Sequence, residues 1–363
     1  MDPISMLQDF IPLPCFLRSQ IVNVHQERSN PSSNAQNISK IGKNIVVLVY
    51  GSYYKEVLLK DLVDGYCTNS THIKVVRSHT CVEHDAVILH FIEYDRFLRE
   101  CVGDRYQKKK TMVIFAMEPP WSVKLTMHIE PTDQNYYILT YSYHRSSLLR
   151  STYFEFYREN SWLNTTLLWN EFTNRKKAGV STISDCQQNH TVRIDYIKRL
   201  SNMFPVDRYG ACVDKKLSKE EFKDLCPKYM FYLSFENSVC DDYITEKYCI
   251  PLNCGAIPVV MSSLHNLVHL IPGSYINALD YESPEHLAQH LSKVSTNFTL
   301  YQRYFIWKKY YKIKPCKFYS NVCEMLDIIY QNTLAPFEDK GLSELTNASK
   351  CLSVNDMLKY MPN

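Results

Sequence analysis

Polar side chains able to bind a phosphorylated ligand follow one apolar segment in the second half of the chain. Tyr229–Phe235 is aromatic and apolar, as a buried strand of a parallel sheet would be. Residues 236–238 predict a polar turn, and Asp241 and Asp242 stand where a helix would begin. Parallel sheets bind ligands at the carboxyl ends of their strands, and a helix amino terminus favours phosphate oxygens. An ordinary strand–helix–strand unit with a polar turn fits the pattern equally well.

The residues after this turn predict a helix and a second strand. Four side chains have the i, i+3, i+4 and i+7 spacing of one helix face: Tyr243, Glu246, Lys247 and Ile250. We expect Pro251 to end the helix and Gly255 to mark its exit. Ala256–Met261 is then a short apolar strand.

The letters of this region resemble a known family. FENSVCDDYITEK, followed by CGAIPVV, resembles the donor-binding signature of the Golgi-type α1,3/α1,4-fucosyltransferases, which use GDP-fucose. SDCQQNHTVRIDYIKRL…VDRYGAC and GSYINALDYESPEHLAQHLSKV…YQRYFIW resemble further segments of that family. The resemblance runs from about residue 40 to about residue 325 and is dense after residue 176. It implies α/β architecture with two Rossmann-like domains facing a cleft, of the GT-B glycosyltransferase type.

The resemblance assigns roles in holding the donor. Lys247 and Arg193 would neutralise the diphosphate, with Arg199 as a competitor of Arg193, and Glu246 would accept hydrogen bonds from the ribose hydroxyls. Without the family match, Lys247 would be read as a surface lysine paired with Glu246. The other expected donor contacts are Glu236, Asn237, Ser238, Tyr243 and Thr245.

Glu118 is the candidate catalytic base. It directly follows the predicted strand Thr111–Met117, and we expect Pro119 and Pro120 to stop the strand there. A Glu after a strand is by itself more often structural. Family members carry the proposed base in a Met-Glu-Ser-Pro-like turn, whereas this chain has MEPP.

The stretch Thr140–Ser147, TYSYHRSS, resembles only in part a family loop of the form TLSYRRDSD. Ser142, Tyr143, Arg145 and Ser147 match, but both aspartates of the family loop are missing. We expect Tyr143 and Arg145 to contact the acceptor or the loop. The first hypothesis is therefore an inverting α1,3-fucosyltransferase acting on N-acetylglucosamine in a glycoprotein or glycolipid glycan. The alternative is a catalytically weak relative that binds sugar nucleotide or glycan without turnover. An unrelated sugar-nucleotide enzyme of the same fold would prefer another donor.

Composition excludes some classes of partner. A formal charge of +3 over 363 residues is too small to predict nucleic-acid binding, and the densest basic run, Lys108–Lys110, reads as a solvated turn. No Cys-x-x-Cys pair or spaced His cluster predicts a metal site. No Asp-x-Asp pair follows a predicted strand, so we expect cationic side chains to hold the diphosphate. The resemblance implies GDP-fucose as a substrate, a glycan acceptor and no obligatory cofactor, with at most stimulation by a divalent cation.

Glycosylation sequons and cysteines favour an oxidising lumen. Asn-x-Ser/Thr sequons stand at Asn37, Asn69, Asn164, Asn189, Asn297 and Asn347. Thirteen cysteines leave at least one thiol free or paired between chains, and Cys316 and Cys323 are the predicted local disulfide. The family's Golgi location implies a membrane anchor, but no run in this chain reaches the about 18 apolar residues that crossing a bilayer takes.

Alternating strands and helices predict the domain plan. Residues 1–40 read as a flexible stem, 41–170 as an acceptor-side Rossmann-like domain, 171–312 as the GDP-fucose-binding Rossmann-like domain, and 313–363 as a C-terminal extension. We expect Trp162–Lys177 to link the two domains and Asn297–Tyr311 to form one helix. We also expect Ser218 to cap a helix, with Glu221 completing a capping box.

Overall fold

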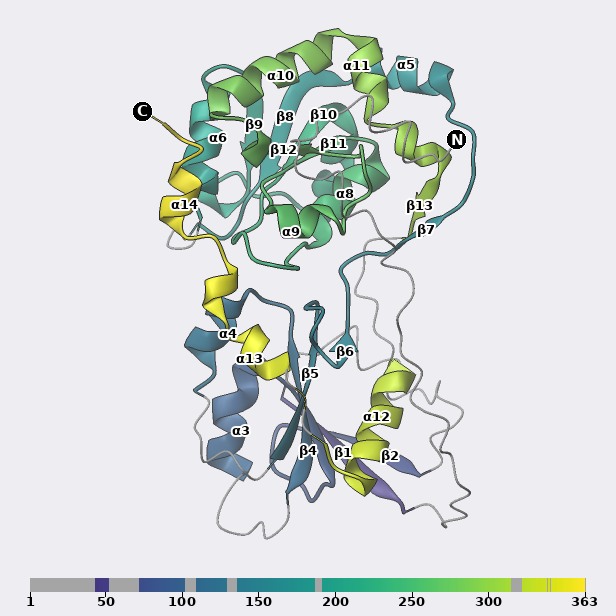
Figure 1. The fold of residues 1–363 in the computed structure, drawn as a ribbon, viewed down its shortest axis with the longest axis vertical. Helices are drawn as coiled ribbons and strands as arrows, with labels where there is room; N and C mark the ends of the chain where they lie inside the picture. Colours follow the sequence, from purple (N-terminus) through teal and green to yellow (C-terminus); the bar gives the residue numbers. More distant parts are fainter. Residues whose placement is uncertain are drawn as a thin grey trace. The chain divides into compact units, whose positions relative to one another are not determined.

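The structure is a computed structural model that describes residues 43–51, 72–101, 109–128, 136–186, 191–314, 322–337, 339 and 341–362. Ile45–Asn363 forms one compact unit that carries two parallel sheets (Figure 1). No helix in the described ranges is long and apolar enough to cross a bilayer. A small antiparallel pair joins β7 (Phe156–Arg158) to β13 (Tyr311–Ile313).

The first sheet has six parallel strands in the order β2-β1-β3-β4-β5-β6. Its strands are β1 (Ile45–Tyr50), β2 (Ile73–Ser78), β3 (Ala86–His90), β4 (Lys110–Ala116), β5 (Tyr136–Ser142) and β6 (Leu149–Arg150). The central strands are buried on both faces, which explains their continuous apolar sequences. Helices α3 (Tyr94–Cys101) and α4 (Pro120–Thr126) follow β3 and β4.

The second sheet has five parallel strands in the order β12-β11-β10-β8-β9. Its strands are β8 (Lys176–Thr182), β9 (Val206–Tyr209), β10 (Tyr229–Ser234), β11 (Ile257–Val260) and β12 (Ile276–Asn277). In the first sheet, β2 lies on one side of β1 and β3 lies on the other. In the second sheet, β9 lies on one side of β8 and β10 lies on the other. This switch in direction is where doubly wound sheets bind ligands. The predicted α/β class with two Rossmann-like halves is confirmed.

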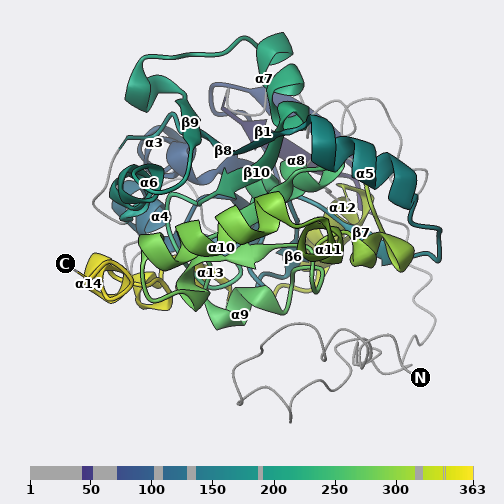
Figure 2. The same cartoon turned by 90° about the horizontal axis from the view of Figure 1, so that it is seen from above.

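Helices of the second half pack around its sheet (Figure 2). They are α5 (Thr165–Asn174), α6 (Arg193–Ser201), α7 (Lys219–Leu225), α8 (Glu246–Cys254), α9 (Leu264–Leu267), α10 (Pro284–Thr296) and α11 (Phe298–Arg303). Ser218 caps α7, and Glu221 completes the predicted capping box. Leu287 and Leu291 of α10 point into the core and are fully buried.

Two of the predicted elements differ from the structure. The expected link, Trp162–Lys177, contains helix α5, because its Leu168 and Phe172 bury themselves in the core of the second half. Asn297–Tyr311 is two short helical segments, since α11 ends at Arg303 and a 3-10 turn covers Ile306–Lys309. The chain then enters β13.

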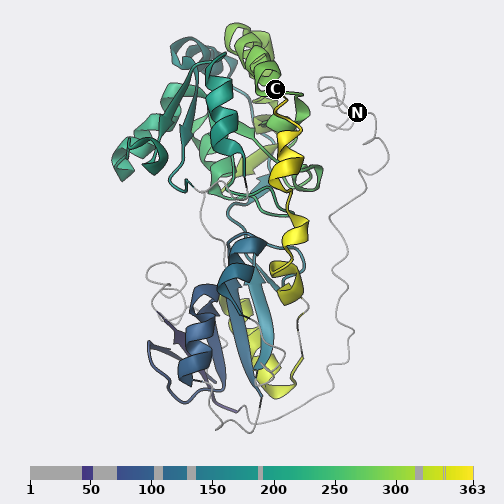
Figure 3. The same cartoon turned by 90° about the vertical axis from the view of Figure 1, so that its left-hand side faces the viewer.

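The C-terminal residues contact both halves (Figure 3). Thr111 of β4 donates to Asn332 of α12 (Val322–Leu334), and the backbone N–H of Thr140 donates to Asp339. Helix α13 (Gly341–Leu345) packs on β5 and α4. The chain then returns to the second half, where Met357 of α14 (Val354–Leu358) is buried in its core.

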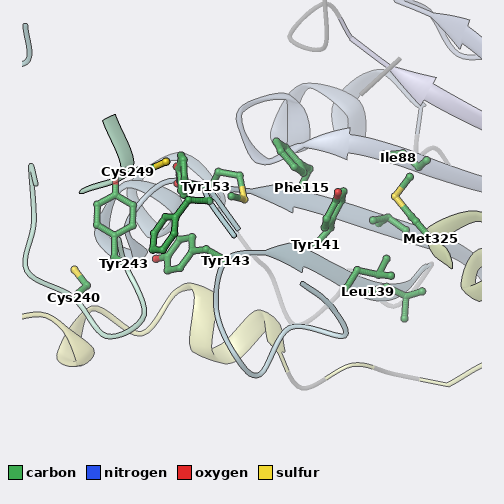
Figure 4. Packing of buried hydrophobic residues seen from close by; sticks show 14 of the residues in the cluster. Ile88, Phe115, Leu139, Tyr141, Tyr143, Tyr153, Cys240, Tyr243, Cys249 and Met325 are labelled. Carbon is green, nitrogen blue, oxygen red and sulfur yellow. The ribbon is translucent and has the colours of Figure 1, made fainter. Parts of the chain in front are cut away.

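One apolar cluster joins side chains of the two halves (Figure 4). Phe115 and Tyr141 come from the first sheet and pack ring to ring at 5.1 Å. Further along the cluster, Tyr143 meets Tyr243 at 5.2 Å. The residues just before α8 are therefore held by aromatic side chains that follow the first sheet.

Disulfides hold loops around both sheets. Cys81 pairs with Cys101, Cys186 with Cys212, Cys226 with Cys254, and Cys240 with Cys351. Cys249 and Cys323 are also disulfide-bonded. The predicted partner of Cys323, Cys316, lies outside the described residues.

Helix α8 differs from the sequence expectation at both ends. It begins at Glu246, with Thr245 as its N-cap, and not near Asp241. Pro251 lies inside the helix, which runs on to Cys254 and ends at left-handed Gly255. Proline has no N–H to bond with the carbonyl of Lys247, four residues earlier. The hydroxyl of Ser234 on β10 donates to that carbonyl at 2.7 Å, so the strand supplies the hydrogen bond that the proline cannot.

We expect Ser234→Ala to lower the free energy of unfolding by about 1–3 kcal/mol, because it leaves the carbonyl of Lys247 without this bond. In a Pro251→Ala background, residue 251 regains an N–H, and the same substitution should cost much less. Urea unfolding of the four chains measures both losses. Equal losses in the two backgrounds would contradict this account of Ser234.

Candidate functional site

A pocket of about 440 Å³ lies at the carboxyl ends of β8 and β10. These two strands flank the switch in strand order of the second sheet. The first half adds Glu118 and Tyr153 to the walls. The other lining residues are Thr182, Ile183, Ser184, Asp185, Arg193, Asn237, Tyr243, Thr245, Glu246 and Lys247.

Arg193 is the first residue of α6 and is 2% exposed. Its guanidinium donates to the carbonyl of Phe235 at 3.3 Å and to that of Asp185 at 2.7 Å. Burial lowers the pKa of Arg193, yet an arginine stays protonated in proteins. Its Nε has no hydrogen-bond partner among the described residues. The neighbouring turns therefore fix the orientation of Arg193 but use only part of its donor capacity.

Lys247 is the second residue of α8, and three oxygen-bearing side chains surround its ammonium group. Nζ lies 3.0 Å from Thr245 Oγ1, 3.1 Å from Glu236 Oε2 and 3.1 Å from Glu246 Oε1. Burial would lower the pKa of Lys247, but the charges of Glu236 and Glu246 outweigh it and raise the pKa above its ordinary value. Lys247 is therefore a permanent cation in the pocket.

The two carboxylates that pair with Lys247 differ in freedom. Glu236 follows β10, is 8% exposed, and also accepts hydrogen bonds from the backbone N–H and hydroxyl of Thr245. The side chain of Glu246 is 44% exposed, and its carboxylate pairs with Lys247. Glu236 is thus a fixed support of the helix start, whereas Glu246 can turn toward a ligand.

Two helices begin at this pocket, α6 at Arg193 and α8 at Glu246. A helix amino terminus carries partial positive charge and unpaired N–H groups. Together with the two cationic side chains, they make this end of the pocket suited to an anion of high charge, such as a diphosphate.

Glu118 lies two residues beyond β4, between that strand and α4. Pro119 is the N-cap of α4 and Pro120 its first residue, so the prolines start a helix where the sequence predicted only a stop. Burial raises the pKa of Glu118, Lys247 opposes this shift, and the neighbouring acidic side chains add to it. The hydroxyl of Tyr153 donates to the carbonyl of Met117 and so holds the backbone next to Glu118.

Seven of the predicted site residues line the pocket, and four others lie outside its lining. Glu236 supports Lys247, and Ser238 accepts a hydrogen bond from the indole of Trp121. Tyr143 is 2% exposed and packs on Tyr243. Arg145 pairs with Asp242 and is outside the pocket lining. The competitor Arg199 pairs with Glu285.

Sequence reasoning missed the wall formed after β8 and the tyrosine from the first half. Thr182 is the last residue of β8, and Ser184 and Asp185 follow it, so the carboxyl end of this strand was a usable signal. Tyr153 had no such signal, because it lies in an irregular stretch between β6 and β7.

The remaining predicted sites lie elsewhere. Asn164 and Asn297 are exposed and Asn347 is half-buried, whereas Asn37, Asn69 and Asn189 lie outside the described residues. Within the described ranges, no group of three or more His, Cys, Asp or Glu side chains is arranged to hold a metal ion.

Asp242 fixes the turn that leads into α8. Its backbone is left-handed, with φ 61°, and its N–H donates to Asn266 Oδ1 at 2.7 Å. Its carboxylate accepts hydrogen bonds from the backbone, Nε and Nη2 of Arg145 and lies 3.2 Å from His269 Nε2. Burial would raise the pKa of Asp242, but the bonds from His269 and Arg145 hold it well below its usual range.

We expect Asp242→Asn to lower the free energy of unfolding at pH 7 by about 1.5–3 kcal/mol, since it weakens charge-assisted hydrogen bonds. Asparagine tolerates the left-handed backbone as aspartate does, so the change keeps the turn and removes the charge and one acceptor oxygen. Because the folded-state pKa is lowered, the stabilisation is present above the unfolded value of about 3.9 and is lost as pH falls below it.

Urea midpoints at pH 7 and pH 3 measure this effect. The variant should lose less stability than the wild type between the two pH values. Asp241→Asn is the matched control, because the half-buried carboxylate of Asp241 makes no hydrogen bond or ion pair with a described residue. Equal acid sensitivity in the Asp242 variant and the wild type would contradict the prediction.

Comparison with known proteins finds a family model and relatives that match the second half of the chain. Residues 172–339 match the family model described as Glycosyltransferase family 10 (fucosyltransferase) C-term. "Alpha-(1,3)-fucosyltransferase C" of Drosophila melanogaster is 29% identical over 263 residues, which are 67% of this chain and 61% of that protein. "4-galactosyl-N-acetylglucosaminide 3-alpha-L-fucosyltransferase 9" of Bos taurus is 34% identical over 160 residues, 43% of this chain and 44% of that protein. The chain thus spans less than two thirds of the length of either relative.

A solved structure, the crystal structure of an alpha1,3-fucosyltransferase with GDP, aligns with 82% of this chain and 92% of its own at 14% identity and a TM-score of 0.49. The family match covers β10, α8 and Arg193, and so includes most of the pocket. Residues 172–339 thus match the C-terminal domain of the glycosyltransferase family 10 (fucosyltransferase) proteins, the family that the sequence motifs resemble.

Proposed function

We propose that this protein is an inverting α1,3-fucosyltransferase. It moves L-fucose from GDP-fucose to a hydroxyl of N-acetylglucosamine in a glycan of a glycoprotein or glycolipid. The observation that carries the proposal is a single pocket that contains Glu118, Arg193 and Lys247. A glycosyl transfer from a nucleotide needs a base and a cationic site for the leaving group, and this pocket offers both.

The donor diphosphate binds between the starts of α6 and α8. Arg193 and Lys247 face it with fixed positive charge. The three donors of the Lys247 ammonium are already used by Thr245, Glu236 and Glu246, so a phosphate must replace one of them. Glu246 is the exposed partner, and it leaves Lys247 to accept hydrogen bonds from the ribose hydroxyls. Thr245, Tyr243 and Asn237, whose buried Oδ1 lacks a partner among the described residues, line the rest of the donor site.

The reaction is one in-line displacement. The acceptor hydroxyl loses its proton to Glu118 as its oxygen bonds to the anomeric carbon of fucose. The bond from that carbon to the β-phosphate oxygen breaks on the opposite face, and GDP leaves with the electron pair. Arg193 and Lys247 stabilise the charge that develops on the diphosphate. Attack from the face opposite the leaving group inverts the configuration.

The name of one relative supports the proposed acceptor. The Bos taurus protein is named as a 3-fucosyltransferase of a 4-galactosyl-N-acetylglucosaminide, which supports N-acetylglucosamine as the acceptor sugar. We assign residues 41–170 to the acceptor side, 171–312 to the donor domain and 313–363 to an extension, with stem residues 1–40 before them. The four cysteine pairs within the described ranges support a location in the Golgi lumen.

We expect Glu118→Gln to lower kcat for fucosyl transfer by about 100-fold or more, because the acceptor loses its base. Binding of GDP, measured by calorimetry, should stay close to wild type, since Glu118 does not pair with the diphosphate. Lys247→Met should instead weaken GDP binding at least tenfold and also lower kcat, because Lys247 stabilises the charge that develops on the leaving diphosphate. Glu83→Gln, an exposed carboxylate remote from the pocket, is the control.

Three results would overturn the proposal. GDP binding with no transfer to any acceptor of a glycan array would favour the binding-only relative. Transfer from a different sugar nucleotide in preference to GDP-fucose would favour another enzyme of the same fold. Full activity of Glu118→Gln would remove Glu118 from the reaction.

The pH dependence of kcat/KM tests the environment of Glu118. A base must be deprotonated, so activity falls as pH drops through its pKa. Since burial raises that pKa above the ordinary 4.5, the acid limb should have its midpoint above that value. Glu246→Gln removes a neighbouring negative charge and should move the midpoint to lower pH. An unmoved midpoint in that variant would assign the limb to another group.

A further inference from the structure

Large apolar side chains lie exposed on and just before helix α5. Trp162 is 99% exposed, Leu167 55% and Trp169 48%. Leu167 and Trp169 are two positions apart in the helix and so lie on opposite sides of the buried Leu168. Of the three, Trp169 is the one that borders another helix, and we call the exposed surface around it the α5 face.

The α5 face continues onto the start of α11. The ring of Trp169 lies 4.9 Å from that of Phe298, edge to face, and Phe172 lies 5.5 Å from Phe298. Phe298 is the first residue of α11. One side of the Trp169 indole is therefore packed against the protein, while almost half of its surface remains open.

Two sequon asparagines stand at the helix starts that border this face. Asn164 is the N-cap of α5 and Asn297 the N-cap of α11, and both are exposed. Each uses its side-chain oxygen as the cap, since Oδ1 of Asn164 accepts from Leu167 N at 2.9 Å and Oδ1 of Asn297 from Leu300 N at 3.1 Å. Neither Nδ2 makes a hydrogen bond to a described residue.

An N-linked glycan is attached through Nδ2, so modification and capping use different atoms of the same side chain. In the transfer, Nδ2 bonds to the anomeric carbon of a lipid-diphosphate-linked oligosaccharide, and that carbon's bond to the phosphate oxygen breaks. The nitrogen loses a proton and the lipid diphosphate leaves. A separate enzyme of the secretory pathway catalyses this step. The helix cap survives the modification, because Oδ1 keeps both of its lone pairs.

We propose that Asn297 carries an N-linked glycan whose first sugar covers the exposed indole of Trp169. Phe298, the residue after Asn297, touches Trp169, so the glycan starts one residue from a side chain that contacts the indole. A sugar ring has an apolar face of C–H groups, and burying it on an indole removes apolar surface from water on both sides. The modification thus stabilises the fold at this place as well as making the surface more polar.

The test uses the full chain secreted from a eukaryotic cell. Peptide mass spectrometry should find the glycan at Asn297. Thr299→Ala destroys the sequon but leaves Asn297 to cap α11, and Thr299 is exposed. This variant should lower Tm by about 2–4 °C. In a Trp169→Ala background the same substitution should change Tm by less than half as much, because the glycan has lost its surface.

Enzymatic release of the glycan from the folded wild type provides a measurement without substitution. It converts Asn297 to aspartate, which still caps α11. Acrylamide quenching of tryptophan fluorescence should rise on release in the wild type and not in Trp169→Ala.

Three outcomes would overturn the proposal. They are an unmodified Asn297, equal Tm losses from Thr299→Ala in the two backgrounds, and a glycosylated wild type that is dimeric where Trp169→Ala is monomeric. The last result would make the α5 face an interface between two copies of the chain. The Thr299→Ala variant should retain the fucosyl-transfer activity of the wild type in full. A failure of the glycan proposal is therefore distinguishable from a failure of the proposed reaction.

Discussion

The fold must keep two cations charged inside one partly buried pocket. Burial alone would lower the pKa of Lys247, and the carboxylates of Glu236 and Glu246 prevent this. Arg193 donates to two backbone carbonyls and lies 3.7 Å from the carboxylate of Asp185. Each cation is therefore held by acceptors that the protein itself supplies, and an anionic ligand would have to compete with the carboxylates among them.

The order of the strands determines where these groups meet. Residues 183–185 and Arg193 follow β8 in the chain. Lys247 follows β10, which lies beside β8 on the side opposite β9. Connections after β8 and β10 leave the sheet in different directions, so their loops separate and make room between them. Glu118 follows a strand of the other sheet. Glu118 and the two cations thus come from different halves.

The sequence predicted the strands and helices around the site because their apolar periodicity is strong, and it predicted seven of the pocket residues through the family motif. It failed where tertiary contacts override local rules. Pro251 ends a helix by local chemistry, but Ser234, which is distant in sequence, replaces the missing bond. Asp242 takes up a left-handed backbone because Arg145 and Asn266 hold it, and no pattern of neighbours signals this. Tyr153 enters the pocket from an irregular stretch that has no periodicity to detect.

The same contacts change the meaning of the altered loop TYSYHRSS. Two of its residues that match the family contact the turn before α8. Tyr143 packs its ring on Tyr243, and Arg145 pairs with the carboxylate of Asp242. Neither lines the pocket. The match in this loop is therefore explained by support of the donor-side turn. Ser147, at the end of the loop, is buried and hydrogen-bonded to Ser142, at 2.6 Å. The departures in this loop consequently leave Glu118, the two cations and the start of α8 unchanged. Their location outside the pocket lining weakens the case for a relative without turnover.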